Sequence, residues 1–199
     1  MAPRVIILDF DGVILESNGI KDAAFRHTFN DHPEHLDAIM AYHHGVGGLI
    51  RFKKFKYIVE HILHGTYTPD VEEQLAKRFS EYVLSAVTVC PFVPGALEFL
   101  QYFQSRLPMY LVSVNPPKDL EWTLKARNLD GFFKKVYATD QKTAAIKEIL
   151  SMEDIQPSNA VFVGDTLTDY ASAEAAGVPF IGRKVDGAFD GTPAASADA

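Results

Sequence analysis

Two acidic clusters, each placed directly after an apolar run, are the residues of this sequence best suited to chemistry. Asp9 and Asp11 follow the apolar residues 5–8. Asp165 and Asp169 follow a second apolar run farther along the chain. Side chains two apart on a strand point to the same side, so Asp9 and Asp11 would lie together. Close carboxylates repel unless a cation neutralises them or one keeps its proton, so this spacing favours a Mg²⁺ site beside a nucleophile, Asp9, and a proton donor, Asp11.

Both clusters also have ordinary structural interpretations. Asp and Gly are common turn residues, so the stretch Asp9-Phe10-Asp11-Gly12 could be only the turn that ends a strand. Thr168 or Asp169 could be a helix cap. A calcium-binding loop is excluded, because apolar residues 13–15 occupy the positions after Gly12 where acidic ligands would be needed.

Further polar residues follow other strand-like stretches. Ser113 ends the apolar run at 110–112, and Asn115 comes two residues later. Lys142 stands at the expected start of a helix, where a cation opposes the helix dipole unless an anion lies nearby. Taken singly, Ser113 could be a loop hydroxyl and Lys142 a solvated lysine. Because Ser113, Asn115 and Lys142 follow successive strands, as the two acidic clusters do, a shared functional site is favoured over these separate structural roles.

The elements that must position these residues are short strands alternating with helices. The strand-like stretches are residues 5–10, 109–114, 135–138, 160–164 and 179–183, and the helical patterns between them are 96–106, 120–127, 143–150 and 170–176. This alternation predicts an α/β fold with a Rossmann-like parallel sheet. The carboxyl ends of such strands meet at one crevice, where both acidic clusters are expected to converge.

A helical insert separates the first strand from the rest of the core. Four helical patterns, at 20–29, 34–44, 50–64 and 70–87, come before Cys90 with no comparable strand among them. We therefore expect a core of residues 1–17 and 89–185 and a helical cap of residues 18–88. Residues 186–199 are rich in Gly, Ala, Asp, Ser and Pro and are expected to form a flexible tail.

Composition narrows the function classes. The 199 residues carry a net charge of −7, which argues against a nucleic-acid binder with a broadly basic face. No apolar run approaches the ~20 residues needed to span a membrane. The one cysteine, Cys90, excludes an intramolecular disulfide and a zinc site built on cysteines, and it fits a cytoplasmic location.

The insert contains a basic segment that starts a helix. Arg51, Lys53, Lys54 and Lys56 precede the next acid, Glu60. Cations at the positive end of a helix are unfavourable unless an anion binds there. Arg51 and Lys54, three apart, share a helix face. The alternative interpretation is a solvated basic face.

The four motifs together resemble those of the haloacid dehalogenase superfamily. They are the DxDG of residues 9–12, Ser113, Lys142 and the GDxxxD of residues 164–169, and the insert resembles that superfamily's first type of helical cap. The resemblance implies Asp9 as the nucleophile, Asp11 as the acid and base, and Ser113 and Lys142 as phosphoryl-binding groups. It also implies Mg²⁺ held by Asp9, Asp165 and Asp169, with the backbone carbonyl of Asp11 as a further metal ligand.

The resemblance also implies a reaction. Members that cleave carbon–halogen bonds usually lack the second aspartate, so Asp11 favours a phosphatase or a phosphomutase. We expect hydrolysis of a small phosphomonoester, a sugar or short-acid phosphate, through an aspartyl phosphate. Asn115 and the cap residues Arg51, Lys54 and Lys21 are expected to bind this substrate. The alternatives are a hexose-phosphate mutase similar to beta-phosphoglucomutase, and a non-catalytic ligand-binding member of the fold.

Overall fold

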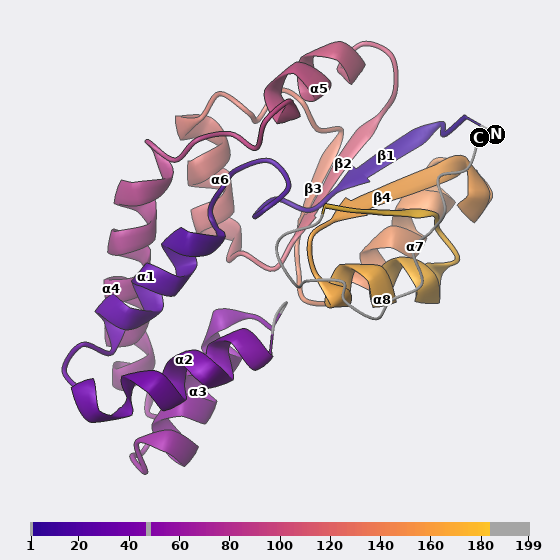
Figure 1. The fold of residues 1–199 in the computed structure, drawn as a ribbon. Helices are drawn as coiled ribbons and strands as arrows, with labels where there is room; N and C mark the ends of the chain where they lie inside the picture. The colour runs from indigo at the N-terminus through magenta and orange to yellow at the C-terminus, as the bar shows by residue number, and fades with distance from the viewer. Residues whose placement is uncertain (1, 47–48, 184–199) are drawn as a thin grey trace.

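A five-stranded parallel sheet forms the centre of the molecule (Figure 1). The computed structural model describes residues 2–46 and 49–183. The strand order is β3-β2-β1-β4-β5, and every neighbouring pair is parallel. The strands are β1 (Val5–Leu8), β2 (Met109–Ser113), β3 (Lys135–Ala138), β4 (Ala160–Gly164) and β5 (Phe180–Gly182). The predicted α/β class with a parallel sheet is confirmed.

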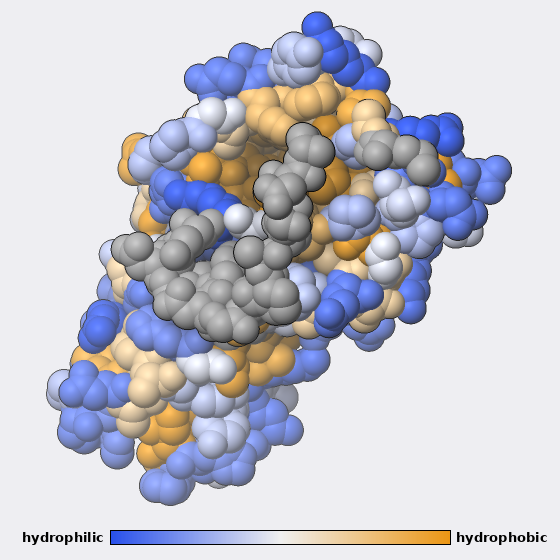
Figure 2. Space-filling view, turned by 45° about the vertical axis from the view of Figure 1, so that its right-hand side comes forward, coloured by the Kyte–Doolittle hydropathy of each residue, from blue (hydrophilic) through white to orange (hydrophobic). Residues whose placement is uncertain are grey.

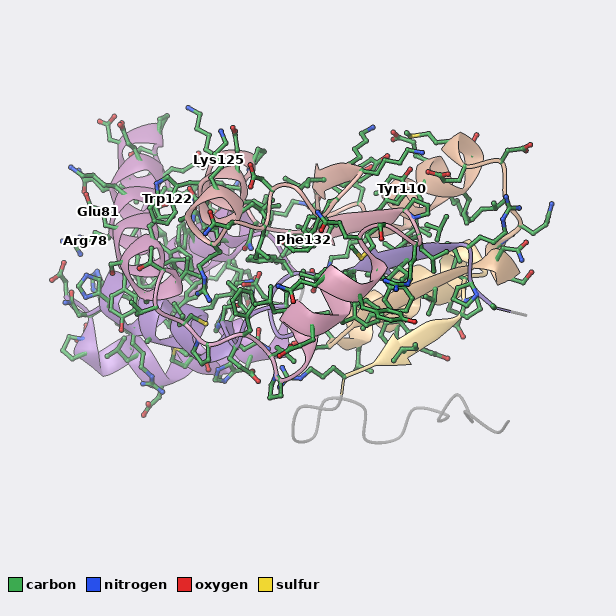
Figure 3. The ribbon with its side chains drawn as sticks, turned by 90° about the horizontal axis from the view of Figure 1, so that it is seen from above. Arg78, Glu81, Tyr110, Trp122, Lys125 and Phe132 are labelled. Carbon is green, nitrogen blue, oxygen red and sulfur yellow. The ribbon has the colours of Figure 1, made fainter. Side chains whose placement is uncertain are left out.

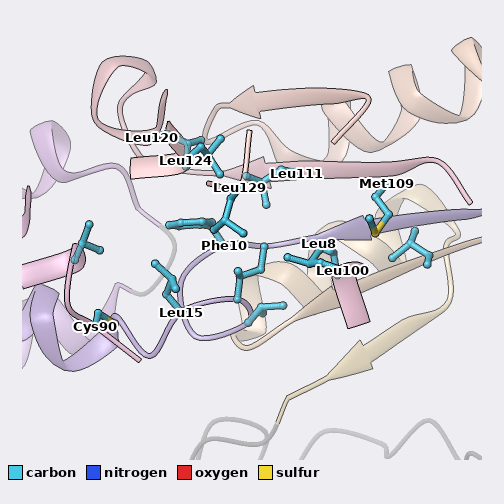
Figure 4. Close-up of a cluster of buried hydrophobic side chains, with 14 residues drawn as sticks. Leu8, Phe10, Leu15, Cys90, Leu100, Met109, Leu111, Leu120, Leu124 and Leu129 are labelled. Carbon is cyan, nitrogen blue, oxygen red and sulfur yellow. The ribbon is translucent and has the colours of Figure 1, made fainter. Parts of the chain in front are cut away.

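Helices bury both faces of the central strand. Val5 and Ile7 of β1 pack in a cluster with α7 (Lys142–Met152) and α8 (Leu167–Ala176). Ile6 and Leu8 point to the opposite face, toward α5 (Ala96–Phe103) and α6 (Pro117–Ala126) (Figure 4). Successive strand side chains alternate between faces, so burial on both sides explains the uninterrupted apolar run of β1.

One part of the sheet remains open beside α5. Ile6 and Leu8 of β1, Val163 of β4 and Ile181 of β5 line a groove of about 360 Å³ with Phe99 of α5. Figure 2 shows apolar side chains gathered in a hollow on this side of the molecule. Ile181 is 56% exposed there, so the described residues cover this face only partly.

Four helices lie beyond the carboxyl ends of the strands (Figure 1). They are α1 (Asn18–Thr28), α2 (Leu36–Gly45), α3 (Arg51–Tyr57) and α4 (Pro69–Val87), with 3₁₀ turns at Pro33–His35 and, in the core, at Pro157–Asn159. Phe25, Phe29, Phe55 and Phe79 form the centre of their own apolar cluster. Figure 3 shows α4, which carries Glu81, beside the core helix α6, which carries Trp122. The boundaries of a cap at residues 18–88 stay a prediction.

The helix expected over residues 50–64 is not a single α-helix. The α-helix α3 ends at Tyr57 and a π-turn, Ile58–Ile62, follows it. The amide of Leu63 donates to the carbonyl of Ile58 at 2.9 Å, which is the five-residue spacing of a π-turn. His64, with φ of 54°, then ends the segment. The predicted tail, residues 186–199, lies outside the described residues.

None of the described helices is both long and apolar enough to cross a lipid bilayer.

Candidate active site

The ends of β1 and β4 bring the two acidic clusters together. The backbone amide of Asp9 donates to the carbonyl of Val163 at 2.9 Å, which joins the two strand ends. Carboxylate oxygens of Asp9, Asp165 and Asp169 lie within 4.8 Å of one another. Each of these residues is at most 6% exposed. The site is therefore a buried concentration of negative charge at the centre of the sheet edge.

Two glycines make room for these carboxylates. Gly12 has φ of +70°, and a Cβ there would lie 2.0 Å from Oδ2 of Asp165. At Gly164, a Cβ would lie 2.4 Å from the Cβ of Asp169. Both contacts are far shorter than van der Waals distance, so any larger residue must displace an acid of the site.

We expect Gly164→Ala to lower both stability and activity. The added methyl meets Asp169 at its rigid Cβ, and overpacking of this kind costs about 1–3 kcal/mol of unfolding free energy. Urea unfolding measures the loss. Gly131→Ala is the matched control, because its added Cβ would meet only Nε2 of Gln104 at 4.0 Å. Equal stability of the two variants would contradict the close packing described here.

Lys142 is the cation of this acidic centre. It is the first residue of α7 and only 4% exposed. Its Nζ lies 2.9 Å from Oδ1 of Asp9 and 2.6 Å from Oδ1 of Asp169. Burial lowers the pKa of Lys142, but the charges of Asp9 and Asp169 outweigh it and hold this pKa above its ordinary value. Lys142 is therefore a charged ammonium shared by two carboxylates.

The surroundings of Asp9, in contrast to those of Lys142, disfavour its charged form. Burial is the main cause that raises the pKa of Asp9, Lys142 opposes the rise, and the neighbouring acids Asp169, Asp11 and Asp165 add to it, so that the pKa lies at about 7. Burial also raises the pKa of Asp165, while a hydrogen bond from Asn18 acts against the rise. The described residues thus leave this acidic cluster short of positive charge.

Asp11 belongs to a different network. Its Oδ2 accepts from Nζ of Lys21 at 2.5 Å and from Nδ2 of Asn115 at 2.7 Å, and its Oδ1 accepts from Oγ of Ser17 at 2.5 Å. Burial raises the pKa of Asp11, but Lys21 and these hydrogen bonds together hold it below its usual range. The carboxylate of Asp11 is outside the cluster of three acids, and its expected contribution through the backbone carbonyl stays a prediction.

Two polar residues of the site carried no strong signal in the sequence. Ser17 stands just before α1, where its hydroxyl could cap the helix, but the hydroxyl binds Asp11 instead. Asn18 donates from Nδ2 to Oδ2 of Asp165 at 2.6 Å. A serine before a helix and an asparagine at its first position look like ordinary residues of a helix start. Only the fold shows that they reach the acids of both strands.

The N-cap residue of α8 is Thr166, not Thr168 or Asp169, because the helix begins earlier than the sequence pattern predicts. Thr166 and Asp169 form a capping box at the start of α8, in which the Thr166 amide and hydroxyl both donate to Oδ2 of Asp169. Its other oxygen, Oδ1, accepts from Lys142. One carboxylate oxygen of Asp169 thus completes the capping box at the start of α8, and the other forms the ion pair with Lys142 in the acidic site.

Ser113 and Asn115 follow β2 beside this site. Ser113 is fully buried at the end of the strand, and its Oγ accepts from the backbone amide of Asn115 at 3.2 Å. Asn115 lines the cavity above the acids. Binding of a phosphoryl oxygen by Ser113 and of substrate by Asn115 stay predictions.

A cavity of about 410 Å³ lies between these strand ends and the cap helices. Its core side is lined by Asp9, Asp11, Lys142, Asp165 and Asn115, and its cap side by Lys21, Arg51 and Lys54, among other residues. The structure thus places all three predicted cap cations at the cavity that contains the acidic site.

Arg51 and Lys53 contact the core directly. Nη1 of Arg51 donates to Oδ2 of Asp119 in α6 at 2.6 Å, and its Nη2 donates to Ser80 at 3.0 Å. Lys53 pairs with Asp140. Arg51 is one of the cap residues predicted to bind the substrate, and its guanidinium already forms an ion pair with a core carboxylate. That role stays a prediction and would require Arg51 to exchange Asp119 for substrate.

The cluster of Asp9, Asp165 and Asp169 fits a divalent metal. All its donors are carboxylate oxygens, the ligands that Mg²⁺ prefers. Lys142 supplies one positive charge against three buried carboxylates, which leaves a net negative site.

Comparisons with known proteins identify the family of this chain. Residues 6–183 match the family model of haloacid dehalogenase-like hydrolases. Phosphoglycolate phosphatase from Pseudomonas putida is 24% identical over 187 residues, which cover 90% of this chain and 69% of the relative. Phosphoglycolate phosphatase 1 from Pseudomonas aeruginosa is 24% identical over 88% of this chain and 67% of its own.

Solved structures share the fold at low identity. The putative hydrolase YfnB from Bacillus subtilis, bound to magnesium, has a TM-score of 0.70 at 15% identity and covers 90% of this chain and 88% of its own. CbbY from Rhodobacter sphaeroides, in complex with xylulose-1,5-bisphosphate, has a TM-score of 0.72 at 16% identity, over 92% and 87% of the two chains. The family match spans both acidic clusters, Ser113 and Lys142, and so this chain belongs to the haloacid dehalogenase-like hydrolase family.

Proposed function

We propose that this protein is a Mg²⁺-dependent phosphatase that hydrolyses a small phosphomonoester through an aspartyl phosphate. The observation that carries the proposal is the placement of Asp9. It lies beside Lys142, within an oxygen cluster suited to a hard cation, at the edge of a 410 Å³ cavity. The relatives named phosphoglycolate phosphatase support the same chemistry.

In the first step, Asp9 attacks the phosphoryl group. A carboxylate oxygen of Asp9 forms a bond to phosphorus while the bond from phosphorus to the ester oxygen breaks. The ester oxygen takes a proton from the carboxyl group of Asp11 and leaves as an alcohol. Since Lys21 favours the ionised form of Asp11, this step requires Lys21 to leave that carboxyl first.

In the second step, water releases the phosphate. Asp11, now ionised, takes a proton from a water molecule, whose oxygen bonds to phosphorus as the bond to Asp9 breaks. The products are inorganic phosphate, a free Asp9 carboxylate and a protonated Asp11. The contacts from Lys21, Ser17 and Asn115 stabilise the ionised form of Asp11 that this step needs.

Charge neutralisation is the other contribution of the site. Phosphoryl transfer depends mainly on positioning and on stabilising negative charge. Lys142 already sits against the nucleophile and is placed to hold a phosphoryl oxygen. Asp9, Asp165 and Asp169 would hold Mg²⁺, which when bound supplies further positive charge next to the phosphoryl group.

A screen of phosphate esters with detection of free phosphate tests the proposal. We expect release that depends on Mg²⁺ and falls by at least ~100-fold in excess chelator, because the buried acids then lose their counter-charge. Restoring Mg²⁺ should restore the rate. Full activity in excess chelator would contradict the proposed metal dependence.

The same screen separates the two alternatives. A phosphomutase would convert one sugar phosphate into its isomer with little free phosphate, which product analysis detects. A non-catalytic member would bind esters without releasing phosphate from any of them. The complete set of Asp9, Asp11, Lys142, Asp165 and Asp169 argues against the non-catalytic alternative. The relatives named phosphoglycolate phosphatase favour hydrolysis over isomerisation.

A further inference from the structure

Lys54 is a buried cation of the cavity wall whose described contacts are all neutral. It lies on α3, is 5% exposed, and lines the same cavity as Asp9. Its Nζ is 3.0 Å from Nδ1 of His43 and 3.1 Å from the carbonyl oxygen of His43. Within the described part of the chain, no carboxylate forms an ion pair with Lys54, in contrast to Lys21 and Arg51.

The hydrogen bonds of His43 fix the direction of this network. Nε2 of His43 lies 3.0 Å from Oδ1 of Asp22, and a carboxylate only accepts. An ammonium only donates, so Nδ1 of His43 must accept from Lys54 while Nε2 donates to Asp22. His43 is therefore a neutral imidazole with an assigned tautomer. Burial first, and then the charge of Lys54, lowers its pKa to about 4, in keeping with this neutral form.

Three helices hold the network rigidly. Asp22 lies on α1, His43 on α2 and Lys54 on α3. The ring of His43 stacks on Phe25 with centroids 4.0 Å apart, and His44 also contacts Asp22 through Nε2, at 2.9 Å. The imidazole can neither turn nor withdraw without breaking these contacts, so it holds the ammonium of Lys54 in one place.

A metal ion is a poorer explanation for Asp22, His43 and His44. Their ligand atoms lie within 4.8 Å of one another, as a metal site would require. A metal-binding histidine normally donates its other ring N–H to an acceptor. Here the other nitrogen of His43 faces an ammonium, which cannot accept. Hydrogen bonds to Asp22 account for both imidazoles without a metal.

The ammonium of Lys54 retains one donor for a ligand. It has three N–H bonds, and the described residues accept two of them. Burial first, and then the charge of Lys21, lowers the pKa of Lys54 to about 8, and the charge of Asp22 only partly opposes this shift. The two ammonium groups therefore repel each other across the cavity wall. An anion bound between them would relieve both the repulsion and the burial of an uncompensated charge.

On the basis of the proposed function, we infer that Lys54 binds a carboxylate on the leaving group of the substrate and that His43 positions it for this. The substrate class is thus the phosphorylated short hydroxy acids rather than neutral phosphate esters. His43 contacts neither the phosphoryl group nor Asp9. It acts through Lys54, and Asp22 acts through His43.

A pair of esters tests this assignment. 2-Phosphoglycolate carries a carboxylate where ethyl phosphate carries a methyl group, and both have the same phosphoryl group. We expect Lys54→Met to reduce the ratio of their kcat/KM values by about 10- to 100-fold, the worth of one hydrogen bond to a charged group. Lys56→Met is the control, because Lys56 is exposed on the same helix, and it should leave the ratio unchanged.

Two variants of His43 separate positioning from packing. His43→Phe keeps a ring to stack on Phe25 but removes the acceptor for Lys54, so the ratio should fall as it does in Lys54→Met. His43→Asn offers an amide oxygen near the position of Nδ1 and should restore most of the ratio. Equal losses on both esters in His43→Phe would reduce His43 to a packing residue and overturn its positioning role.

A binding measurement keeps this inference separate from the proposed function. In a background of Asp9→Asn, calorimetry compares the binding of the two esters with and without Lys54→Met. A preference for 2-phosphoglycolate that Lys54→Met removes supports the carboxylate site even if the wild-type protein hydrolyses neither ester. The absence of any preference in calorimetry, or a ratio unaffected by Lys54→Met, overturns the inference.

Discussion

Asp9→Asn is expected to abolish phosphate release while leaving the protein folded. An amide oxygen is a very weak nucleophile, so the covalent step with phosphorus is lost and kcat should fall by at least ~1,000-fold. Single-turnover assays on the best ester of the screen measure this loss. Near-normal single-turnover rates in the variant would contradict the covalent mechanism.

Stability provides the control for Asp9→Asn. The fold disfavours the charged form of Asp9, because burial and the neighbouring acids raise its pKa to about 7. A neutral amide removes that penalty, so the variant measured in chelator should unfold at the same urea concentration as wild type or a higher one. A marked loss of stability would instead mean that the Lys142 contact outweighs burial, and the kinetic result would then need correction for unfolded protein.

The fold could be predicted because its signals are local. The apolar run before Asp9 fits a strand buried on both faces, and the Pro and Gly residues between patterns mark where helices begin and end. The π-turn at Ile58–Ile62 could not be predicted in this way. Its apolar residues keep helical spacing, and only the hydrogen bond from Leu63 to Ile58 reveals the wider turn.

The acidic residues of the site could be predicted for a similar reason. Parallel strands end at one edge, so Asp9 and Asp165 had to meet once both were placed at strand ends. The environment of each cap cation could not be predicted, because it depends on residues far away in the chain. Arg51 pairs with Asp119, 68 residues later, whereas Lys54 faces His43. Sequence spacing placed both cations on one helix face but could not tell which one had a carboxylate partner.

Lys142→Met is expected to reduce both stability and activity severely. The substitution keeps an unbranched apolar side chain and removes only the ammonium that Asp9 and Asp169 share. Breaking a buried ion pair by removing one partner costs about 3–5 kcal/mol, because the remaining charges stay buried without compensation. Chemical unfolding in chelator measures this loss, and Lys147→Met, at an exposed position of the same helix, should stay within ~0.5 kcal/mol of wild type.

A double variant separates the two roles of Lys142. Adding Asp169→Asn to Lys142→Met removes one of the stranded carboxylates, so part of the lost unfolding free energy should return. Phosphate release should not return, because the nucleophile still lacks the cation beside it and the oxygen cluster has lost an acid. Recovery of stability without recovery of activity would separate the two roles. Lys142 would then stabilise the fold by neutralising buried acids, and it would support the reaction through its position beside Asp9. If the double variant is less stable than Lys142→Met alone, the charge imbalance is not what destabilises the single variant, and the contact of Asp169 with Thr166 is the more important one.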